Sequence, residues 1–306
     1  MTSSAVIRAL CDDAQLTAGS FIVTVYGDVV VPRGEVLWMG SLIEVCAQVG
    51  ISENLVRTAV SRLVSAGRLE GERAGRRSFY RLAPAARDEF AGAERLLYAP
   101  PVSDAAANGA GAPQGWRLVQ GAGMADDALR RAGFGRLGGD VWIAPDRGQQ
   151  IKGASVTMTA APVGDSRALA ACWDLEPIAA GYARLVGRFA PLAAQPMTEG
   201  ADALMARLLL VDAYRAVLLR DPRLPPDALP PDWPGHTAAA LFRKLYLGLS
   251  PQADAEVAQW LLGERHNLPA ETPRTQARLD ALTGAPPDGG SQPVLRTRAD
   301  GNITQS

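Results

Sequence analysis

The chain has 306 residues, of which 47% are hydrophobic, enough to bury two or three modest cores. Lys and Arg number 31 against 32 Asp and Glu, which excludes a polycation that coats nucleic acid or anionic membrane but leaves room for a local basic patch. Two histidines and three cysteines lie too far apart to form a metal-ligand pair, so we expect no metal site. Lys152 and Lys244 are the only lysines, so phosphate recognition would rest on planar guanidinium groups.

The apolar runs are short. Residues 21–25 and 208–211 fall far below the roughly 20 residues that a membrane helix needs. No basic segment leads into an apolar stretch at the N-terminus, so no secretion signal is indicated. Widely spaced cysteines fit a reducing compartment. We therefore expect a cytoplasmic protein with no membrane contact.

Composition divides the chain. Ala, Gly and Pro dominate from residue 99 and predict a flexible linker, and the prolines after Asn267 leave little that could pack. The expected class is α+β. The expected parts are an N-terminal domain at 1–98, the linker at 99–114, an α+β domain at 115–192, a helical C-terminal domain at 198–265 and a disordered tail at 283–306.

Two helices and a hairpin are predicted within residues 37–82. Leu37, Leu42, Ile43, Val45 and Cys46 indicate an amphipathic helix that ends at Gly50. After a short turn, Ser52 can cap a second helix. The second helix has an apolar face formed by Leu55, Val56, Ala59, Val60, Leu63 and Val64. Residues 69–82 are typical of a hairpin with a glycine-containing basic tip, so the segment predicts a winged helix-turn-helix.

Charge is segregated within the first 98 residues. Residues 57–81 hold seven arginines and two glutamates, net +5, whereas the rest of 1–98 has a net charge of −5. Such polarity favours one face that docks on double-stranded DNA. The predicted base-reading residues are Asn54, Arg57, Thr58, Ser61 and Arg62, and the predicted phosphate and wing contacts are Ser52, Arg73, Arg76 and Arg77.

The remaining elements follow from periodicity. Short strands are predicted at 116–119, 139–144 and 154–159, with a helix at 126–132. A long helix opens near Thr198, and a proline-rich turn at 221–234 leads to a second helix that carries Leu241, Leu245 and Leu249.

Nine short stretches resemble the PaaX family of bacterial repressors of phenylacetic acid catabolism. They lie at residues 21–28, 32–34, 37–43, 50–54, 56–63, 138–145, 210–215, 221–225 and 229–235, and the resemblance covers about 16–262. It implies a winged helix, a ferredoxin-like middle domain similar to Cas2 and a helical C-terminal domain. It also implies a helix at 18–30, where β-branched residues alone would favour a strand. The extended linker and the tail depart from the family pattern.

Family members are typically homodimers that leave their operator when an aryl-acyl-CoA, characteristically phenylacetyl-CoA, binds. The resemblance thus implies a repressor of an aromatic-acid catabolic operon with an acyl-CoA effector and no cofactor. Arginines suit the CoA phosphates, and aromatic rings suit the aryl group. The candidate effector-binding residues are Trp142, Arg188, Arg215 and Trp233.

Two alternatives remain. A Cas2-like domain could be a metal-dependent nuclease that uses Asp126, Asp127 or Asp140, but adjacent acids on a helix do not face one site, and Asp140 could equally form a turn. The winged helix could also bind a protein instead of DNA. With no nucleophile or base in a recognisable arrangement, we expect a protein without catalytic residues.

Overall fold

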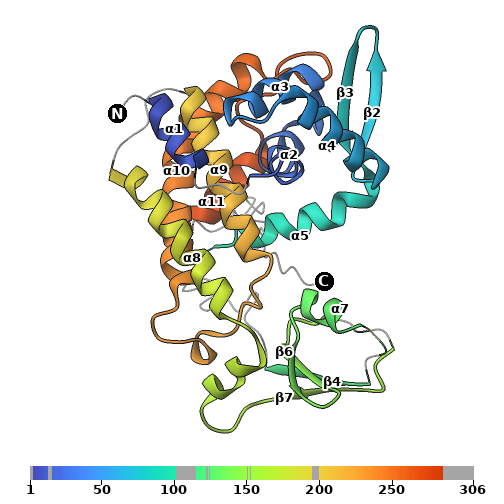
Figure 1. Cartoon of the computed structure of the whole chain (residues 1–306), viewed down its shortest axis with the longest axis vertical. Helices are drawn as coiled ribbons and strands as arrows, with labels where there is room; N and C mark the ends of the chain where they lie inside the picture. Colours follow the sequence, from blue (N-terminus) through green and yellow to red (C-terminus); the bar gives the residue numbers. More distant parts are fainter. Residues whose placement is uncertain are drawn as a thin grey trace, which may run out of the picture.

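The computed structural model describes residues 3–12, 16–100, 115–121, 123, 125–149, 151, 153–194 and 200–284. Helices predominate, and two antiparallel sheets lie far apart, which confirms the α+β class. Figure 1 shows a large helical body that carries one sheet as a projecting hairpin, with the second sheet at the opposite end. Almost all of the predicted linker (101–114) and of the predicted tail (285–306) lies outside the described residues.

The N-terminal segment is helical. It comprises α1 (Ser3–Asp12), which the sequence pattern did not predict, and α2 (Ala18–Val25), which continues through η1 (Tyr26–Val30) and η2 (Val31–Arg33). The helix that the resemblance implied at 18–30 is thus confirmed. It forms despite its β-branched residues because apolar side chains on all its sides are buried, so tertiary packing outweighs intrinsic propensity.

Next come two helices and a hairpin. The elements are β1 (Val36–Trp38), α3 (Met39–Gln48), α4 (Glu53–Ser65), β2 (Leu69–Ala74) and β3 (Arg77–Leu82), with the strands in the order β1-β3-β2. Leu37 was wrongly placed in a helix, because it lies in β1 opposite Tyr80 of β3. Ser52 stands at the N-cap of α4, but its side chain makes no capping hydrogen bond.

After η3 (Pro84–Ala86) and α5 (Arg87–Leu97), a four-stranded sheet forms. Its elements are β4 (Trp116–Gln120), α7 (Asp126–Arg131), β5 (Gly135–Gly138), β6 (Val141–Pro145) and β7 (Val156–Ala160). The order is β5-β6-β4-β7, with every neighbouring pair antiparallel. The three predicted strands and the predicted helix are confirmed, whereas β5 was not predicted. A small core of Val119, Leu129, Phe134, Trp142 and Ala144 fills the side that α7 covers.

The chain is helical from residue 166 on, whereas helices were expected only from residue 198 on. This part comprises η4 (Ser166–Cys172), α8 (Glu176–Phe189), η5 (Ala190–Ala194), α9 (Gly200–Leu218), η6 (Pro226–Ala228), α10 (Pro234–Trp260) and α11 (Pro273–Thr283). The expectation that little packs after Asn267 is wrong. Pro273 occupies the first turn of α11, and Thr272 caps it in a reciprocal capping box with Thr275, so this proline starts a helix.

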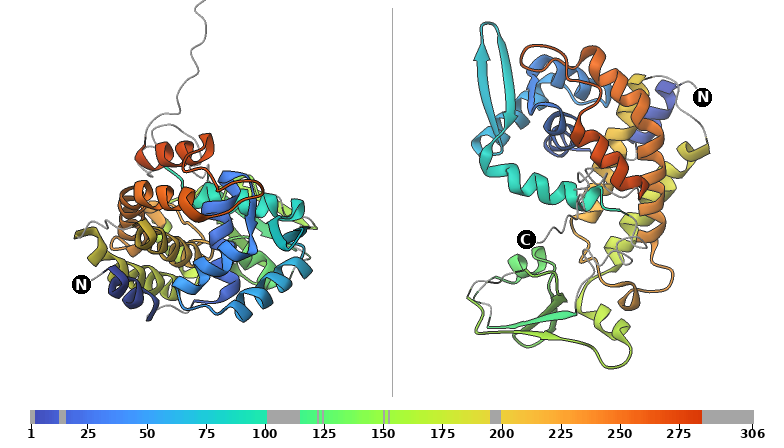
Figure 2. Two further views of the ribbon diagram at one scale, coloured as in Figure 1. Left: turned by 90° about the horizontal axis from the view of Figure 1, so that it is seen from above. Right: turned by 180° about the vertical axis from the view of Figure 1, so that it is seen from behind.

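One continuous core joins the two ends of the chain. Buried residues of α2, such as Phe21 and Ile22, belong to the same cluster as Leu208 and Leu210 of α9 and Leu282 of α11. Helix α11 lies against η2 of the N-terminal segment and against α10, in agreement with the views in Figure 2. Within the described part of the chain, no helix combines the length and apolarity needed to cross a bilayer.

Candidate nucleic-acid interface

Helix α4 has a narrow buried stripe and a broad polar face. Val56 and Val60 are buried against the body of the protein, which contributes about 1.5–3 kcal/mol for each side chain. The five residues predicted to read bases are all exposed on the rest of the helix; they are Asn54, Arg57, Thr58, Ser61 and Arg62. The structure therefore brings these candidates together on one accessible surface.

Local contacts already hold part of this surface. Arg57 Nε donates to Glu53 Oε1 at 2.8 Å, and Arg57 Nη2 lies 2.7 Å from the same oxygen. The Thr58 hydroxyl donates to the Asn54 carbonyl at 2.8 Å, one turn earlier. The prediction that Leu55 belongs to the apolar face is wrong: it is 56% exposed, whereas the next residue, Val56, is fully buried.

The hairpin β2–β3 projects from the body beside α4 (Figures 1 and 2). The predicted contacts Arg73, Arg76 and Arg77 are exposed along it, and Gly75 at its tip has a φ of +61°, which glycine adopts without strain. The Arg77 guanidinium lies 5.3 Å from the ring centroid of Trp38, a cation–π distance that links the tip end of β3 to the end of β1.

The seven arginines of 57–81 fall into two groups. Arg57, Arg68 and Arg81 pair with Glu53, Glu89 and Glu72 at 2.7, 2.7 and 2.8 Å. Within the described residues, the other four form no ion pair; they are Arg62, Arg73, Arg76 and Arg77. The surface formed by α4 and the hairpin thus carries several positive charges without a protein counterion, as a phosphate-binding surface requires.

Backbone contacts fix this surface to the C-terminal helices. The Trp38 N–H donates to the Leu262 carbonyl at 2.9 Å, and the Leu262 N–H donates to the Ser41 hydroxyl at 3.0 Å. Tyr26 of η1 donates its hydroxyl proton to the Tyr80 carbonyl of β3 at 3.1 Å. The base of the hairpin and the start of α3 are therefore held by elements from both ends of the chain.

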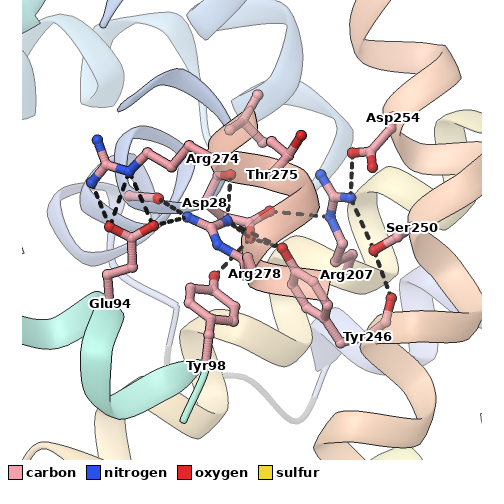
Figure 3. Close-up of polar contacts among 12 residues, drawn as sticks. Asp28, Glu94, Tyr98, Arg207, Tyr246, Ser250, Asp254, Arg274, Thr275 and Arg278 are labelled. Atoms are coloured by element: carbon pink, nitrogen blue, oxygen red, sulfur yellow. Dashed lines mark hydrogen bonds and ion pairs between the residues drawn. The ribbon is translucent and has the colours of Figure 1, made fainter. Parts of the chain in front are cut away.

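A buried ionic centre lies beneath these elements (Figure 3). Asp28 of η1 is 3.1 Å from Arg207 of α9 and 3.2 Å from Arg278 of α11, and it accepts hydrogen bonds of 2.8 Å from the hydroxyls of Tyr98 and Tyr246. Burial alone would raise the pKa of Asp28, but the two arginines and the two hydroxyls outweigh burial and bring it below the ordinary value. Asp28 is therefore an anion that joins four helical elements and the end of α5.

Glu94 of α5 forms the outer layer of this centre. It accepts a hydrogen bond of 2.7 Å from Arg278 and also pairs with Arg274, both on α11. Burial raises the pKa of Glu94, but the hydrogen bonds and charges of the two arginines have the larger effect. The pKa of Glu94 therefore lies below its ordinary value. Arg207 also binds Asp254 at 2.6 Å, which extends the network along α10.

The four candidate effector residues lie in separate surroundings. Trp142 is buried in the small core under Arg136, whose guanidinium is 4.6 Å from the ring centroid. Arg188 binds the Leu10 carbonyl of α1. Arg215 donates to the Ser20 hydroxyl of α2 at 2.8 Å, and Trp233 packs edge-on against Tyr182. The structure does not bring these four together.

The carboxylates considered for a nuclease have structural partners. Asp126 pairs with Arg136, Asp127 lies 3.3 Å from Arg130, and Asp140 accepts a 2.9 Å hydrogen bond from the Gly121 N–H. The described residues contain no group of three or more His, Cys, Asp or Glu side chains placed to hold a metal ion. The geometry therefore gives no support to the nuclease alternative.

Sequence reasoning missed several residues of this region. Trp38 and Glu53 contact two arginines of the interface, and Asp28, Arg207 and Arg278 build the ionic centre. The i,i+4 spacing of Glu53 and Arg57 was a usable signal, because such pairs face one another on a helix. Nothing in the sequence indicates the pairing of Asp28 with two distant arginines.

Two family models and one relative point to the same family. The family model described as PaaX-like protein matches residues 17–86, and the model described as PaaX-like protein C-terminal domain matches residues 173–259. The chain is 32% identical over 271 residues to the transcriptional repressor PaaX of Escherichia coli (strain K12), covering 78% of this chain and 83% of the relative. A solved structure of the uncharacterized protein Rv0674 from Mycobacterium tuberculosis is 24% identical and has a TM-score of 0.46, with 78% of this chain and 98% of that chain covered.

Proposed function

The chain belongs to the family of PaaX-like proteins, and on that premise we propose that it is a DNA-binding transcriptional repressor. The observation that carries the proposal is the surface of α4 and the hairpin β2–β3, where exposed polar side chains stand beside arginines without a protein counterion. An exposed helix followed by a basic hairpin is the arrangement of a winged helix-turn-helix, in which the second helix enters the major groove. This role is regulatory and needs no catalytic residue.

We assign the face of α4 to base recognition. Arg57 and Arg62 have the fork geometry that reads guanine, Asn54 can read adenine, and Thr58 and Ser61 can serve a base edge or a phosphate. The exposed Leu55 adds an apolar contact of the kind that thymine methyl groups receive. These residues would determine which sequence is bound.

The hairpin and the start of α4 would position the protein on the DNA backbone. Arg73, Arg76 and Arg77 would contact phosphates or enter the minor groove, and Ser52, whose side chain caps nothing, is available to a phosphate oxygen. Such contacts add affinity for any sequence and depend strongly on salt.

We further propose that the repressor is a homodimer that reads two half-sites about one DNA turn apart. The order β5-β6-β4-β7, with α7 between β4 and β5, supports a ferredoxin-like middle domain similar to Cas2, although the described residues between β6 and β7 contain no second helix. The edge strand β7 exposes Val156 and Met158 on one side, which favours burial against a second copy.

For the effector we propose an aryl-acyl-CoA, such as phenylacetyl-CoA, that releases the repressor from an aromatic-acid operon. The support is the resemblance to the family. Arg215 lines a cavity of about 40 Å³ between α2, α5 and α9, far below the roughly 300–1,000 Å³ of a typical ligand pocket. An acyl-CoA would therefore need a rearranged or different site, and Trp142, Arg188 and Trp233 stay candidates for it.

The test is selection of bound duplexes from a random library, followed by fluorescence anisotropy on the enriched sequence. We expect a specific dissociation constant at least about 1,000-fold below that for unrelated DNA, and release by one member of a panel of CoA thioesters. Arg57→Ala should reduce the sequence preference, whereas Arg95→Ala on α5 should leave it unchanged. Failure to enrich any sequence would contradict the proposal and favour a protein-binding role.

A further inference from the structure

The first turn of α4 contains an arginine held by a carboxylate. Glu53 and Arg57 are one turn apart, and a single oxygen, Glu53 Oε1, receives both Arg57 Nε at 2.8 Å and Arg57 Nη2 at 2.7 Å. Both side chains are more than half exposed, at 55% and 56%. The pair is thus presented to solvent on the surface that we assign to base recognition.

The geometry leaves the reading edge of Arg57 open. A guanidinium has five N–H groups in a fixed plane, and the contacts with Glu53 use the edge formed by Nε and Nη2. The outer edge, formed by Nη1 and the second hydrogen of Nη2, has no hydrogen-bond partner among the described residues. That edge has the two parallel donors that guanine O6 and N7 accept.

We propose that Glu53 is a positioning residue that holds Arg57 in the orientation for reading a guanine, and so contributes to sequence specificity without contacting the guanine itself. The inference rests on the proposed DNA-binding function. A free arginine side chain loses rotamer freedom when it binds a base, and a side chain fixed beforehand loses less. Glu53 thus reduces the entropic cost of the specific contact.

Because Glu53 is negatively charged, the proposal predicts opposite changes in two kinds of binding when Glu53 is removed. A carboxylate near the DNA backbone repels phosphates, so its removal should strengthen binding to unrelated DNA while it weakens the preference for guanine. A residue that only stabilised the start of α4 through the helix dipole would change the melting temperature and leave the base preference intact.

The experiment is a double-mutant cycle on the duplex that the wild-type protein selects. The wild type, Glu53→Ala, Arg57→Ala and the double variant are titrated against duplexes with guanine or 7-deazaguanine at the position that Arg57→Ala identifies. Replacing N7 removes one acceptor of the bidentate contact. Thermal unfolding of each variant confirms that it is folded.

We expect Glu53→Ala to reduce the guanine preference about two- to fivefold, as for other exposed ion pairs, and Arg57→Ala to reduce it about tenfold or more. In the Arg57→Ala background, Glu53→Ala should have no further effect on that preference. Glu44→Gln is the matched control, because it removes one exposed charge from α3 that has no ion pair within the described residues.

The outcomes separate the two claims. If the wild type selects no sequence, the proposed function fails and this inference fails with it. If a sequence is selected and Arg57→Ala alters its guanine preference while Glu53→Ala does not, the DNA-binding function stands and the positioning role of Glu53 is wrong. If Glu53→Ala also reduced the guanine preference in the Arg57→Ala background, the positioning role of Glu53 would likewise be wrong.

Discussion

The carboxylate of Asp28 and the guanidinium of Arg207 lie 3.1 Å apart with essentially no exposure to solvent. Asp28 stands in η1, directly after α2, and Arg207 is in α9 of the C-terminal part. Removal of two charges from water is costly, and here Arg278, Tyr98 and Tyr246, which all bind Asp28 Oδ1, offset part of the cost. The position of η1 is thus set by residues from both ends of the chain.

Asp28→Asn should strongly destabilise the protein. The substitution leaves Arg207 and Arg278 buried without their shared carboxylate, and loss of one partner of a buried ion pair costs about 3–5 kcal/mol. Urea unfolding at pH 7 measures the loss as a lower midpoint with an unchanged slope. Glu89→Gln, which removes the exposed partner of Arg68, should cost about 1 kcal/mol or less. If Asp28→Asn and Glu89→Gln lowered the free energy of unfolding equally, the buried ionic centre would contribute no more than an exposed ion pair.

Stability should fall as the solution becomes acidic. The pKa values of Asp28 and Glu94 are lowered in the folded state, because bound arginines outweigh the effect of burial. Unfolding raises these pKa values to about 4, so the stabilisation is present above pH 4 and is lost as the pH falls through the folded-state values. The urea midpoint should therefore begin to decline near about pH 5, where the unfolded-state carboxyl groups start to protonate, and should fall most steeply below about pH 4. In Glu94→Gln the urea midpoint should decline less steeply with falling pH than in the wild type. Identical profiles for the two proteins would contradict the contribution of Glu94 to the pH dependence.

The elements that the sequence predicted best are those with a local signal. The polar face of α4 follows from helical periodicity, and the hairpin follows from its glycine tip. The prediction for Leu55 is wrong, because periodicity assigns every apolar residue near the stripe to the core, while the buried stripe of α4 consists of Val56 and Val60. The helix at 18–30 required the family resemblance, since its side chains are β-branched and only burial on all sides makes it helical.

Contacts between residues far apart in the chain have no local signal in the sequence. Asp28 is one of many acids in the sequence, and its arginine partners are in α9 and α11. The prolines after Asn267 predict broken structure, but Pro273 stands where a proline favours the start of a helix, and α11 begins there. The sequence predicts one basic patch from the seven arginines of 57–81, but three of them pair with glutamates. Glu53 lies one helical turn from Arg57, whereas the fold brings Glu89 to Arg68 and the hairpin brings Glu72 to Arg81.

The arginines of the hairpin should determine the salt dependence of binding. Arg76→Ala combined with Arg77→Ala removes two candidate phosphate contacts, so affinity for all sequences should fall, and the slope of log affinity against log salt should become shallower by about 1.8. Anisotropy titrations at several salt concentrations measure it. The matched control is Arg87→Ala combined with Arg95→Ala on α5, which changes the net charge equally. An unchanged slope in the hairpin variant would contradict this docking mode.

Two helical glycines should respond oppositely to alanine. A Cβ at Gly40 would lie 2.3–2.5 Å from three ring atoms of Trp38, so the ring must move. Overpacking of this kind costs about 1–3 kcal/mol, and displacement of Trp38 also removes the support of Arg77. Gly40→Ala should therefore lower both the melting temperature and the affinity for DNA.

Gly248 in the interior of α10 is the matched control. It is exposed, and a Cβ there meets nothing within 4 Å, so Gly248→Ala should stabilise the protein by about 0.5–1 kcal/mol through the helix propensity of alanine. Its affinity for DNA should stay that of the wild type. If Gly40→Ala lowered the melting temperature without any loss of affinity, Trp38 would serve only to pack α3, and the orientation of Arg77 over its ring would have no role in binding DNA.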